Sequence, residues 1–335
     1  MRPINLLCHI PNAKDATSLY RGLGPLAELR RRNFLQILIA DDFDETSLDV
    51  GDVVFMQRPY TEKHLMMAKH CKAEKKPLWI DYDDFLFGLT PDNPAFEFYG
   101  RGANQSVISQ IVQIADVVTV TTTQLKDCLK TVDGSLNPNI RVIPNALPDK
   151  YLHLARPYQP GRRHVLWRGS ASHERDVMEF TRPILQFAGS RSDVSLSFMG
   201  YNPWFLTNEL PKNQAVHIPS MTPGDYFRAA SEINPSIMMV PLHKSLFNLC
   251  KSNIAWLEGT LFGAVSLVPK WPEWSQPGAA TYESPAGFLE GLVELTKNDD
   301  LARSCHEKSW AFIQENLVLS KVNQMRMEII QEFVA

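Results

Sequence analysis

The stretch FNLCKSNIAWLEGTLFGAVSLV, Phe247–Val268, contains the turn, helix and strand that decide the fold. Apolar residues recur at helical spacing over Ile254–Leu261, and Val265–Val268 is a short apolar run typical of a buried strand. A similar run at Ile237–Val240 precedes the stretch. A strand, a helix and a second strand in this order predict a parallel sheet that is covered by helices.

The same alternation continues outward through the second half of the chain. Further strands are expected at His164–Trp167, Ser195–Met199 and Val216–Ile218, and further helices at Asp176–Ala188 and Gly224–Ala230. The residues from 309 onward have helical periodicity and no strand signal. This half therefore predicts a doubly wound α/β domain followed by a terminal helix.

The first half of the chain shows an independent series of the same kind. Strands are expected at Ile4–Ile10, Leu35–Ala40, Val53–Gln57, Leu78–Ile80, Val117–Val120 and Ile140–Ile143. Helices are expected at Ser18–Arg31, Glu62–Lys75, Ala103–Ile114 and Thr123–Val132. Prolines between 144 and 160, followed by the basic pair Arg162–Arg163, are typical of a linker. We therefore expect an α/β protein with domains at 1–155 and 156–308, whose sheets face a cleft, and a C-terminal helix at 309–335.

Composition excludes several classes of protein. The 34 Lys and Arg against 37 Asp and Glu give a net charge of −3, so the chain as a whole has no positive field for nucleic acid or anionic membranes. No apolar run reaches the roughly 20 residues of a membrane helix. The five scattered cysteines form no CxxC pair, which favours neither a disulfide framework nor a zinc site and predicts a cytoplasmic protein. The chain also lacks the GxSxG and GxxxxGK[ST] motifs of α/β-hydrolases and P-loop NTPases.

The start of the helix in the opening stretch is a candidate phosphate site. A helix that opens near Ser252 or Asn253 presents free N–H groups and the positive end of its dipole, and Lys251 adds a full charge there. Glu258, about two turns further on, is placed to accept hydrogen bonds from a ribose diol. The structural alternative is that Ser252 or Asn253 only caps the helix, while Lys251 and Glu258 are solvated surface charges.

A second candidate site follows the first strand of the second half. Arg168 there is able to bind a phosphate through its planar guanidinium, and the small residues Gly169 and Ser170 let the backbone approach a ligand closely. The first strand–helix turn is the usual phosphate position in doubly wound folds. In the alternative interpretation this is a plain turn, with Arg168 in a surface ion pair and His173 as a polar residue at the start of the helix.

Three carboxylates after the predicted strand Leu78–Ile80 form a third candidate. Asp81, Asp83 and Asp84 are suited to bind sugar hydroxyls, and Asp81 or Asp83 is able to act as a general base. Asp-x-Asp is also a pattern of metal-dependent sugar-nucleotide sites, but the nucleotide signals lie in the other half, so no metal is required. The alternative is that the acids cap a turn and are solvated.

Tyr20 and Arg21 lie at the same edge of the first domain, where Arg21 is placed to reach a diphosphate or an anionic acceptor. In the alternative interpretation the following Gly-Leu-Gly-Pro simply shapes a turn. Gly22-x-Gly24 is not a dinucleotide fingerprint, because Pro25 occupies the next position.

Taken together, these motifs resemble the retaining GT-B glycosyltransferases of the family-4 type, and most of all their phage and bacterial branch. The resemblance rests on Trp167-Arg168-Gly169-Ser170…His173, on Phe247-Asn248…Lys251-Ser252…Glu258 and on Ile80-Asp81-Tyr82-Asp83-Asp84. It implies a GT-B fold of two Rossmann-like domains, with a C-terminal helix that crosses back to the first domain. Cys250 departs from the family pattern, which often has a glutamate that contacts the donor sugar at this position.

The resemblance also implies roles for individual residues. Arg168 and Lys251 look like the basic pair that neutralises the donor diphosphate, and Asp83 falls about where the family has a histidine near the transferred sugar. Catalytic roles are therefore expected for Arg168, Lys251, Asp83 and Asp81, and acceptor-side roles for Tyr20, Arg21 and Asp84. The expected donor-binding residues are Gly169, Ser170, His173, Asn248, Ser252, Asn253, Ile254 and Glu258.

The resulting hypothesis is transfer of a sugar from a nucleoside diphosphate sugar, with a UDP-sugar as the expected donor, to a hydroxyl acceptor. Stabilisation of the leaving diphosphate by positive charge and N–H groups requires no metal and no other cofactor. The acceptor is a carbohydrate, a lipid, a small molecule or a hydroxylated base in DNA, and a phage-encoded protein would act in the host cytoplasm. Basic clusters at 30–32, 72–76 and 162–163 favour DNA, whereas the net charge disfavours it. Two further hypotheses are a scaffold that binds nucleotide sugars without transfer, suggested by Cys250, and a sugar-nucleotide epimerase.

Overall fold

The computed structural model describes residues 4–32, 34–40, 45–131 and 137–334, and these form two compact units. Unit 1 consists of Met1–Pro148, Leu249–Ser252 and Val318–Ala335, and unit 2 consists of Asp149–Asn248 and Asn253–Leu317. The short segment Leu249–Ser252 therefore belongs to unit 1, although the chain on both sides of it belongs to unit 2.

Unit 1 is built on a six-stranded sheet in which every neighbouring pair of strands is parallel. Its strands are β1 (Ile4–His9), β2 (Leu35–Ile39), β3 (Val53–Gln57), β4 (Leu78–Tyr82), β5 (Val117–Val120) and β6 (Ile140–Val142). The spatial order β2-β1-β3-β4-β5-β6 reverses direction between β1 and β3. In doubly wound sheets, ligands bind beyond the carboxyl ends of the strands at such a reversal.

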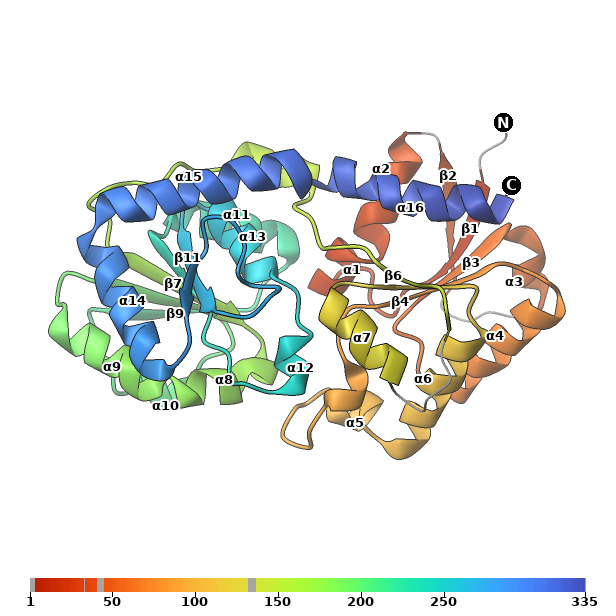
Figure 1. Ribbon diagram of the computed structural model, residues 1–335, viewed down its shortest axis with the longest axis horizontal. Coiled ribbons are helices and arrows are strands. Elements are labelled where there is room, and N and C mark those ends of the chain that lie inside the picture. Colours follow the sequence, from red (N-terminus) through yellow and green to blue (C-terminus); the bar gives the residue numbers. More distant parts are fainter. Residues whose placement is uncertain (1–3, 33, 41–44, 132–136, 335) are drawn as a thin grey trace. The chain divides into compact units, whose positions relative to one another are not determined.

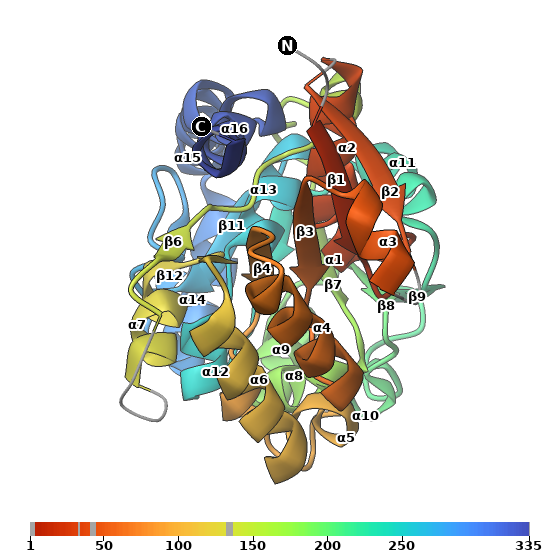
Figure 2. The same ribbon diagram turned by 90° about the vertical axis from the view of Figure 1, so that its right-hand side faces the viewer.

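Helices cover the sheet of unit 1 on both faces, and α4 and α6 lie side by side (Figure 2). The helices are α1 (Ala16–Tyr20), α2 (Leu23–Arg31), α3 (Glu45–Val50), α4 (Glu62–Ala73), α5 (Phe96–Tyr99), α6 (Gly102–Ile114), α7 (Thr123–Thr131) and α16 (Leu319–Val334), with the short 3-10 helix η1 (Leu86–Gly88). The strands β3, β4 and β5 are buried on both faces, as the predicted parallel sheet requires.

Two predictions for the helices of unit 1 need comment. The helix expected over Ser18–Arg31 is interrupted at Gly22, because Pro25 has no N–H to donate to the carbonyl of Arg21 and its ring would clash with that carbonyl. Gly22 also passes so close to Gln57 that an added Cβ would lie 2.4 Å from its Oε1. The chain therefore leaves the helical conformation there, and Leu23 N–H is capped by Ser18 Oγ at 3.1 Å. The expected end of the last helix at Val132 lies outside the described residues.

Unit 2 contains the second six-stranded sheet, which is also parallel throughout. Its strands are β7 (His164–Gly169), β8 (Ser195–Gly200), β9 (Ala215–Pro219), β10 (Ile237–Met239), β11 (Val265–Pro269) and β12 (Ala280–Tyr282). Counted from β7, the spatial order is 6-5-4-1-2-3, which is the order of a Rossmann sheet. The reversal lies between β7 and β10, where Val165 is paired with Ile237.

The helices of unit 2 include α13 and α15, which lie side by side over the sheet (Figure 1). The helical elements are η2 (Asp149–Leu154), η3 (Ala171–His173), α8 (Glu174–Glu179), α9 (Thr181–Ser190), α10 (Trp204–Thr207), α11 (Pro223–Ile233), α12 (Leu246–Leu249), α13 (Ile254–Leu261), α14 (Pro285–Lys297) and α15 (Asp299–Asn316). The single helix expected over Asp176–Ala188 is divided at Phe180. The reason is Pro183, which has no N–H to donate to the carbonyl of Glu179 and whose ring clashes with it.

The borders of the units differ from the expected ones. The chain enters unit 2 at Asp149 rather than at 156, because η2 packs there and Tyr151 stacks on Phe227 with ring centroids 4.0 Å apart. The expected terminal helix is two helices, α15 in unit 2 and α16 in unit 1. Asn323 in α16 donates hydrogen bonds to Pro25 O and Glu28 Oε2 at 3.0 and 2.7 Å, which fixes α16 beside α2 (Figure 1).

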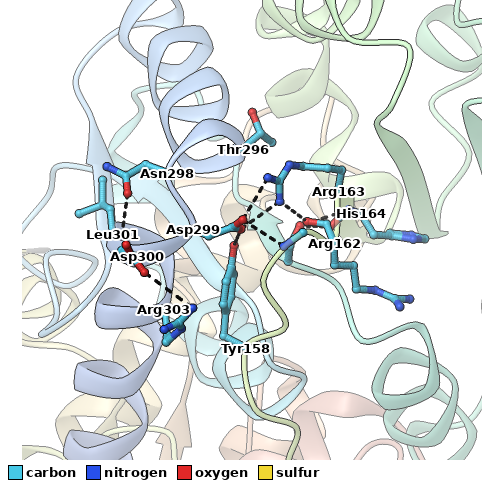
Figure 3. Close-up of polar contacts among 12 residues, drawn as sticks. Tyr158, Arg162, Arg163, His164, Thr296, Asn298, Asp299, Asp300, Leu301 and Arg303 are labelled. Carbon is cyan, nitrogen blue, oxygen red and sulfur yellow. Dashed lines mark hydrogen bonds and ion pairs between the residues drawn. The ribbon is translucent and has the colours of Figure 1, made fainter.

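The predicted linker is packed against unit 2 rather than extended. Tyr158 Oη and the Arg163 guanidinium both donate to the carboxylate of Asp299, at 2.8 Å and 2.9 Å, as Figure 3 shows. Asp299 is the first residue of α15, where a negative charge is favourable. This ion pair ties the entry of β7 to the start of α15. Among the described helices, none is both long enough and apolar enough to span a bilayer.

Candidate functional site

The carboxyl end of β7 carries a buried contact between two residues that the sequence singled out. Arg168 Nε lies 2.8 Å from Glu258 Oε2, and Tyr226 Oη in α11 donates to the same oxygen at 2.8 Å. Glu258 is 4% exposed, so it is not the surface charge of the alternative interpretation. Burial first, and then the negative Glu258, raise the pKa of Tyr226 well above its usual value, so the phenol stays protonated as the donor. Arg168 and Glu258, two residues that the sequence singled out, are therefore in direct contact.

The turn after β7 is shaped by glycines. Gly200, at the end of the neighbouring β8, has a φ of +98°, and a Cβ there would lie 2.3 Å from the carbonyl oxygen of Gly169. The ends of the two strands are therefore closer than side chains would allow. Ser170 follows on the exposed surface and is hydrogen-bonded to Ser172, with the two Oγ atoms 2.6 Å apart. The backbone at Gly169 and Ser170 therefore carries no bulky side chain and is at least partly exposed to solvent, a property that a phosphate-binding turn needs.

The carboxylate of Asp176 in α8 gathers side chains from three segments of unit 2. Its Oδ2 lies 2.8 Å from Nδ1 of His173, and its Oδ1 lies 2.5 Å from Nδ1 of His243, which follows β10. Asn248 Nδ2 also donates to Oδ1 at 2.6 Å. Asn248 is itself 1% exposed, so its predicted contact with the donor is replaced in this structure by bonds within the protein.

The start of α13 differs in detail from the predicted phosphate site. Asn253 is the N-cap residue but makes no side-chain capping bond; its Nδ2 donates to the carbonyl of Glu273 at 3.2 Å. Ile254 is the first helical residue. Ser252 belongs to unit 1, where its Oγ accepts from Asn145 Nδ2 at 2.7 Å. Neither polar side chain is used to cap the helix, in contrast to the structural alternative.

Three predicted residues of unit 1 lie in its interior. Asp81 is 2% exposed and receives two hydrogen bonds from the Arg21 guanidinium, at 2.6 and 3.1 Å, and one from Thr119 Oγ1 at 2.6 Å. Arg21 is 1% exposed and Tyr20 is 3% exposed. The reason is that β4 continues two residues beyond its expected end, so Asp81 points into a sheet that is buried on both faces. This burial favours a structural role over the predicted contacts with substrate.

Asp83 and Asp84 lie beyond the end of β4 and remain partly exposed. Both are ion-paired with Arg58, the residue directly after β3, and the Arg58 Nη2–Asp84 Oδ2 distance is 2.8 Å. Lys251 Nζ lies 3.5 Å from the other oxygen of Asp84. Burial raises the pKa of Asp83, and the charge of Arg58 offsets this only in part. The two exposed acids thus form a charged cluster with Arg58 and Lys251.

The segment that carries Lys251 is anchored in unit 1 by its neighbours. Thr122 Oγ1 donates to the carbonyl of Cys250 at 3.0 Å, and Cys250 Sγ lies 3.5 Å from Sγ of Cys128. Arg168 and Lys251, the predicted pair of cations, consequently fall in different units. Lys251 is therefore a member of the charged cluster of unit 1, whereas Arg168 is a partner of Glu258 in unit 2.

Aromatic rings border the charged cluster of unit 1. Tyr60 packs edge-on against Tyr99 with centroids 4.7 Å apart, and the rings of His9 and His64 are 4.3 Å apart. His64 Nδ1 accepts two backbone hydrogen bonds, from Tyr60 N at 3.0 Å and Thr61 N at 3.2 Å. This region lies at the carboxyl ends of β1 and β3, where the strand order reverses.

Sequence reasoning missed several of these residues. Arg58, Tyr226 and His243 were not predicted, because each is a single polar residue outside a recognised motif. Arg58 and His243 do share one signal: both follow the end of an apolar strand by a few residues. In the described part of the chain, no group of three or more His, Cys, Asp or Glu residues is placed to hold a metal ion.

No protein-family model and no curated protein matches the sequence. Solved structures do match. HepE of Anabaena, crystallised with UDP and glucose, has a TM-score of 0.69 at 11% identity, over 98% of this chain and 100% of that one. A glycosyltransferase from Rickettsia africae has a TM-score of 0.68 at 11% identity, over 100% and 99%. An α,α-trehalose 6-phosphate synthase from Burkholderia multivorans has a TM-score of 0.66 at 10% identity, over 100% and 97%.

At these identities the likeness shows the fold. The chain has the predicted α/β fold of GT-B type, in which two Rossmann-like units with parallel six-stranded sheets follow one another along the sequence.

Proposed function

We propose that this protein is a glycosyltransferase that moves a sugar from a nucleoside diphosphate sugar to a hydroxyl acceptor. The observation that carries the proposal is the contact of Arg168 with Glu258 at the carboxyl end of β7, beside the reversal of a Rossmann sheet. In open α/β sheets a ligand binds at this position. The similar structure of HepE was solved with UDP and glucose, so a UDP-sugar is the donor that we propose first.

On the donor side, Arg168 is the cation proposed to bind the diphosphate. Its guanidinium is held by Glu258, so little conformational freedom is lost when a phosphate binds. Glu258 is proposed to accept hydrogen bonds from the ribose, and the N–H groups at Asn253 and Ile254 to face a phosphate oxygen. Lys251 is the second cation that we assign to the leaving group. With these charges the proposed reaction uses no metal.

On the acceptor side, the exposed acids of unit 1 favour an uncharged hydroxyl compound over a polyanion. Asp83 interacts electrostatically with Tyr99, whose ring packs edge-on against Tyr60. Aromatic rings with nearby carboxylates suit the faces and hydroxyls of a sugar. The two cations of this cluster, Arg58 and Lys251, are already paired with these acids, so the position offers no net positive charge to the phosphates of DNA. A carbohydrate-like acceptor is therefore proposed in preference to a hydroxylated base.

In the proposed reaction the bond between the anomeric carbon and the diphosphate oxygen breaks, and a bond from that carbon to the acceptor oxygen forms. The acceptor proton passes to Asp83, whose raised pKa suits a general base. Arg168 and Lys251 stabilise the charge that develops on the departing diphosphate. We further propose that the anomeric configuration is retained, on the resemblance to the family-4 enzymes alone.

The test is incubation of the protein with radiolabelled UDP-glucose, UDP-N-acetylglucosamine and GDP-mannose, followed by separation of the products. A transferase releases the nucleoside diphosphate slowly in water and faster with an acceptor. An epimerase converts one nucleotide sugar into another, and a scaffold binds without turnover. Arg168→Ala is expected to abolish release, whereas Arg182→Ala on the exposed side of α9 is the matched control and is expected to leave it unchanged. Equal release by the two variants would refute the proposal.

A further inference from the structure

The carboxylate of Asp176 holds two histidine rings, and the geometry around it fixes where their protons lie. Asp176 is 2% exposed, whereas the side chains of His173 and His243 remain 20% and 16% exposed. Each carboxylate oxygen takes one ring, through Nδ1 in both cases. The backbone N–H of His243 adds a third bond to Oδ1 at 3.2 Å. The acid is therefore inside the protein and the rings cover it.

The protonation state of Asp176 follows from its partners. Burial alone would raise the pKa of this carboxyl group, but the hydrogen bonds from His173 and His243 outweigh burial and hold the pKa below its usual range. An ionised carboxylate only accepts hydrogen bonds, so Nδ1 of each ring carries a proton. In a neutral imidazole with its proton on Nδ1, the opposite nitrogen, Nε2, is an acceptor.

The position of His243 connects this acceptor to the proposed donor site. Asp176 lies in the helix that follows β7, and His243 lies four residues after the end of β10. These two strands are neighbours at the reversal of the sheet, and Arg168 ends the same β7. The His243 ring, which Asn248 also contacts through Nδ2, is thus held at the edge where the nucleotide sugar is proposed to bind.

We propose that His243 Nε2 accepts a hydrogen bond from a hydroxyl group of the donor's sugar, and that Asp176 is the residue that positions the ring. The inference rests on the proposed function. An acceptor nitrogen suits a hydroxyl and not a phosphate oxygen, which carries lone pairs of its own. Glu258 is already assigned to the ribose, so the transferred sugar is the part of the donor that we assign to His243.

The test compares the affinity for UDP with the affinity for a UDP-sugar, by titration calorimetry. The probe is whichever of UDP-glucose, UDP-galactose and UDP-N-acetylglucosamine binds the wild-type protein most tightly. His243→Asn keeps an amide near the position of Nδ1, able to bond Asp176, but places nothing at Nε2. His243→Gln reaches toward the position of Nε2 with an amide oxygen that accepts hydrogen bonds.

We expect His243→Asn to weaken binding of the UDP-sugar about three- to tenfold, the loss of one neutral hydrogen bond, and to leave UDP binding unchanged. His243→Gln is expected to restore part of that loss. Asp176→Asn, which removes the ionised acceptor but leaves the Nε2 atom in place, is expected to lie between His243→Asn and the wild type.

Three results would overturn the inference. His243→Asn could leave both affinities unchanged, or weaken UDP and the UDP-sugar by the same factor, which would place the contact on the nucleotide or make it structural. His243→Gln could also bind the UDP-sugar no better than His243→Asn. If His243→Asn does not fold, as judged by its thermal unfolding, the other two variants decide. The ratio of UDP-sugar affinity to UDP affinity is then compared between His243→Gln and Asp176→Asn. A wild-type protein that binds no nucleotide would instead refute the proposed function itself, and the two failures are therefore distinguishable.

Discussion

Both sheets are six-stranded and parallel, but they differ in strand order and in how charges are placed at their carboxyl edges. In unit 1 the exposed acids Asp83 and Asp84 are bound by the cations Arg58 and Lys251. In unit 2 the cation Arg168 is bound by the buried Glu258, and the other acid of that edge, Asp176, is covered by His243 and Asn248. The acids and the cations of unit 1 are therefore partly exposed together, whereas in unit 2 the Arg168 guanidinium is partly exposed and the acids are buried.

This difference indicates how one fold type provides two kinds of site. The strand reversal determines where a ligand binds, and the side chains that follow the strands determine its charge. An edge whose acids and cations are paired with one another suits an uncharged hydroxyl compound, and an edge with an accessible guanidinium suits a diphosphate. The comparison can be tested by removing one charge at a time from each edge.

The largest expected effect comes from the charge pair inside unit 1. Arg21→Ala leaves the carboxylate of Asp81, which is 2% exposed, without its main partner. We expect a loss of about 3–5 kcal/mol in the free energy of unfolding, measured by urea denaturation. The control is Arg101→Ala, which breaks a surface pair with Glu97 and is expected to cost less than about 1 kcal/mol. Similar losses in both variants would contradict the structural role of the Arg21–Asp81 pair.

The next effect concerns the outward acid of unit 1. Asp83→Asn removes the proposed base but keeps the shape of the side chain. We expect kcat to fall about 100-fold while the affinity for UDP changes less than twofold, because Asp83 is paired with Arg58 and not with a cation assigned to the diphosphate. Steady-state kinetics with calorimetry measures both quantities. A large loss of UDP affinity would assign Asp83 to the donor instead.

Substitution of the corresponding acid of unit 2, Glu258, is expected to lower the affinity for UDP, which substitution of Asp83 leaves nearly unchanged. Glu258→Gln keeps a group that accepts hydrogen bonds but removes the charge that holds Arg168. We expect the affinity for UDP to fall about tenfold, the effect of one charge-assisted hydrogen bond. If Glu258→Gln binds UDP as the wild type does, the contrast between the two edges disappears.

Each unit also contains a half-buried histidine whose charge state links stability to pH. Burial, followed by nearby positive groups, lowers the pKa of His64 in unit 1 and of His164 in unit 2 to about 4. Between that value and about 6.5 the unfolded chain binds more protons than the folded one, so stability falls as the pH is lowered from 7 to 5. We expect roughly 1 kcal/mol from each histidine at pH 5.

The test of this effect is the thermal midpoint from pH 7 to pH 5 for His64→Asn and His164→Gln. Asn keeps an acceptor near the position of Nδ1, where His64 receives the N–H groups of Tyr60 and Thr61, and Gln keeps a polar atom near Nε2 for Ser197. Both variants are expected to have a shallower pH dependence than the wild type. An unchanged slope would exclude these two groups as its cause.

The sequence was sufficient to predict the sheets, because parallel strands that are buried on both faces are continuous apolar runs. The expected bounds of β3, Val53–Gln57, are those observed. It was insufficient for α3 and for the edge strand β12, whose three residues Ala280–Tyr282 are too few for a recognisable pattern. The helix breaks at Gly22 and Phe180 each precede a proline, Pro25 and Pro183, which was visible in the sequence, whereas the close approach of Gly22 to Gln57 was not.

The candidate site was predicted as residues but not as contacts. Arg168 and Glu258 were each identified, yet their ion pair, 90 positions apart along the chain, depends on the fold. Among the three acids at the end of β4, the sequence could not separate the buried Asp81 from the partly exposed Asp83, because the expected strand ended at Ile80 and the observed one ends at Tyr82. That two-residue difference places Asp81 inside the sheet.

The central claim is that the carboxyl edge of unit 2, through Arg168, binds the diphosphate of a nucleotide. Calorimetric titration of the wild type and of Arg168→Ala with UDP tests it most directly. We expect one binding site in the wild type and at least a tenfold loss of affinity in the variant, the effect of one charge-assisted contact to phosphate. A wild-type protein that does not bind UDP or any other nucleoside diphosphate, or a variant that binds as tightly as the wild type, would contradict the account.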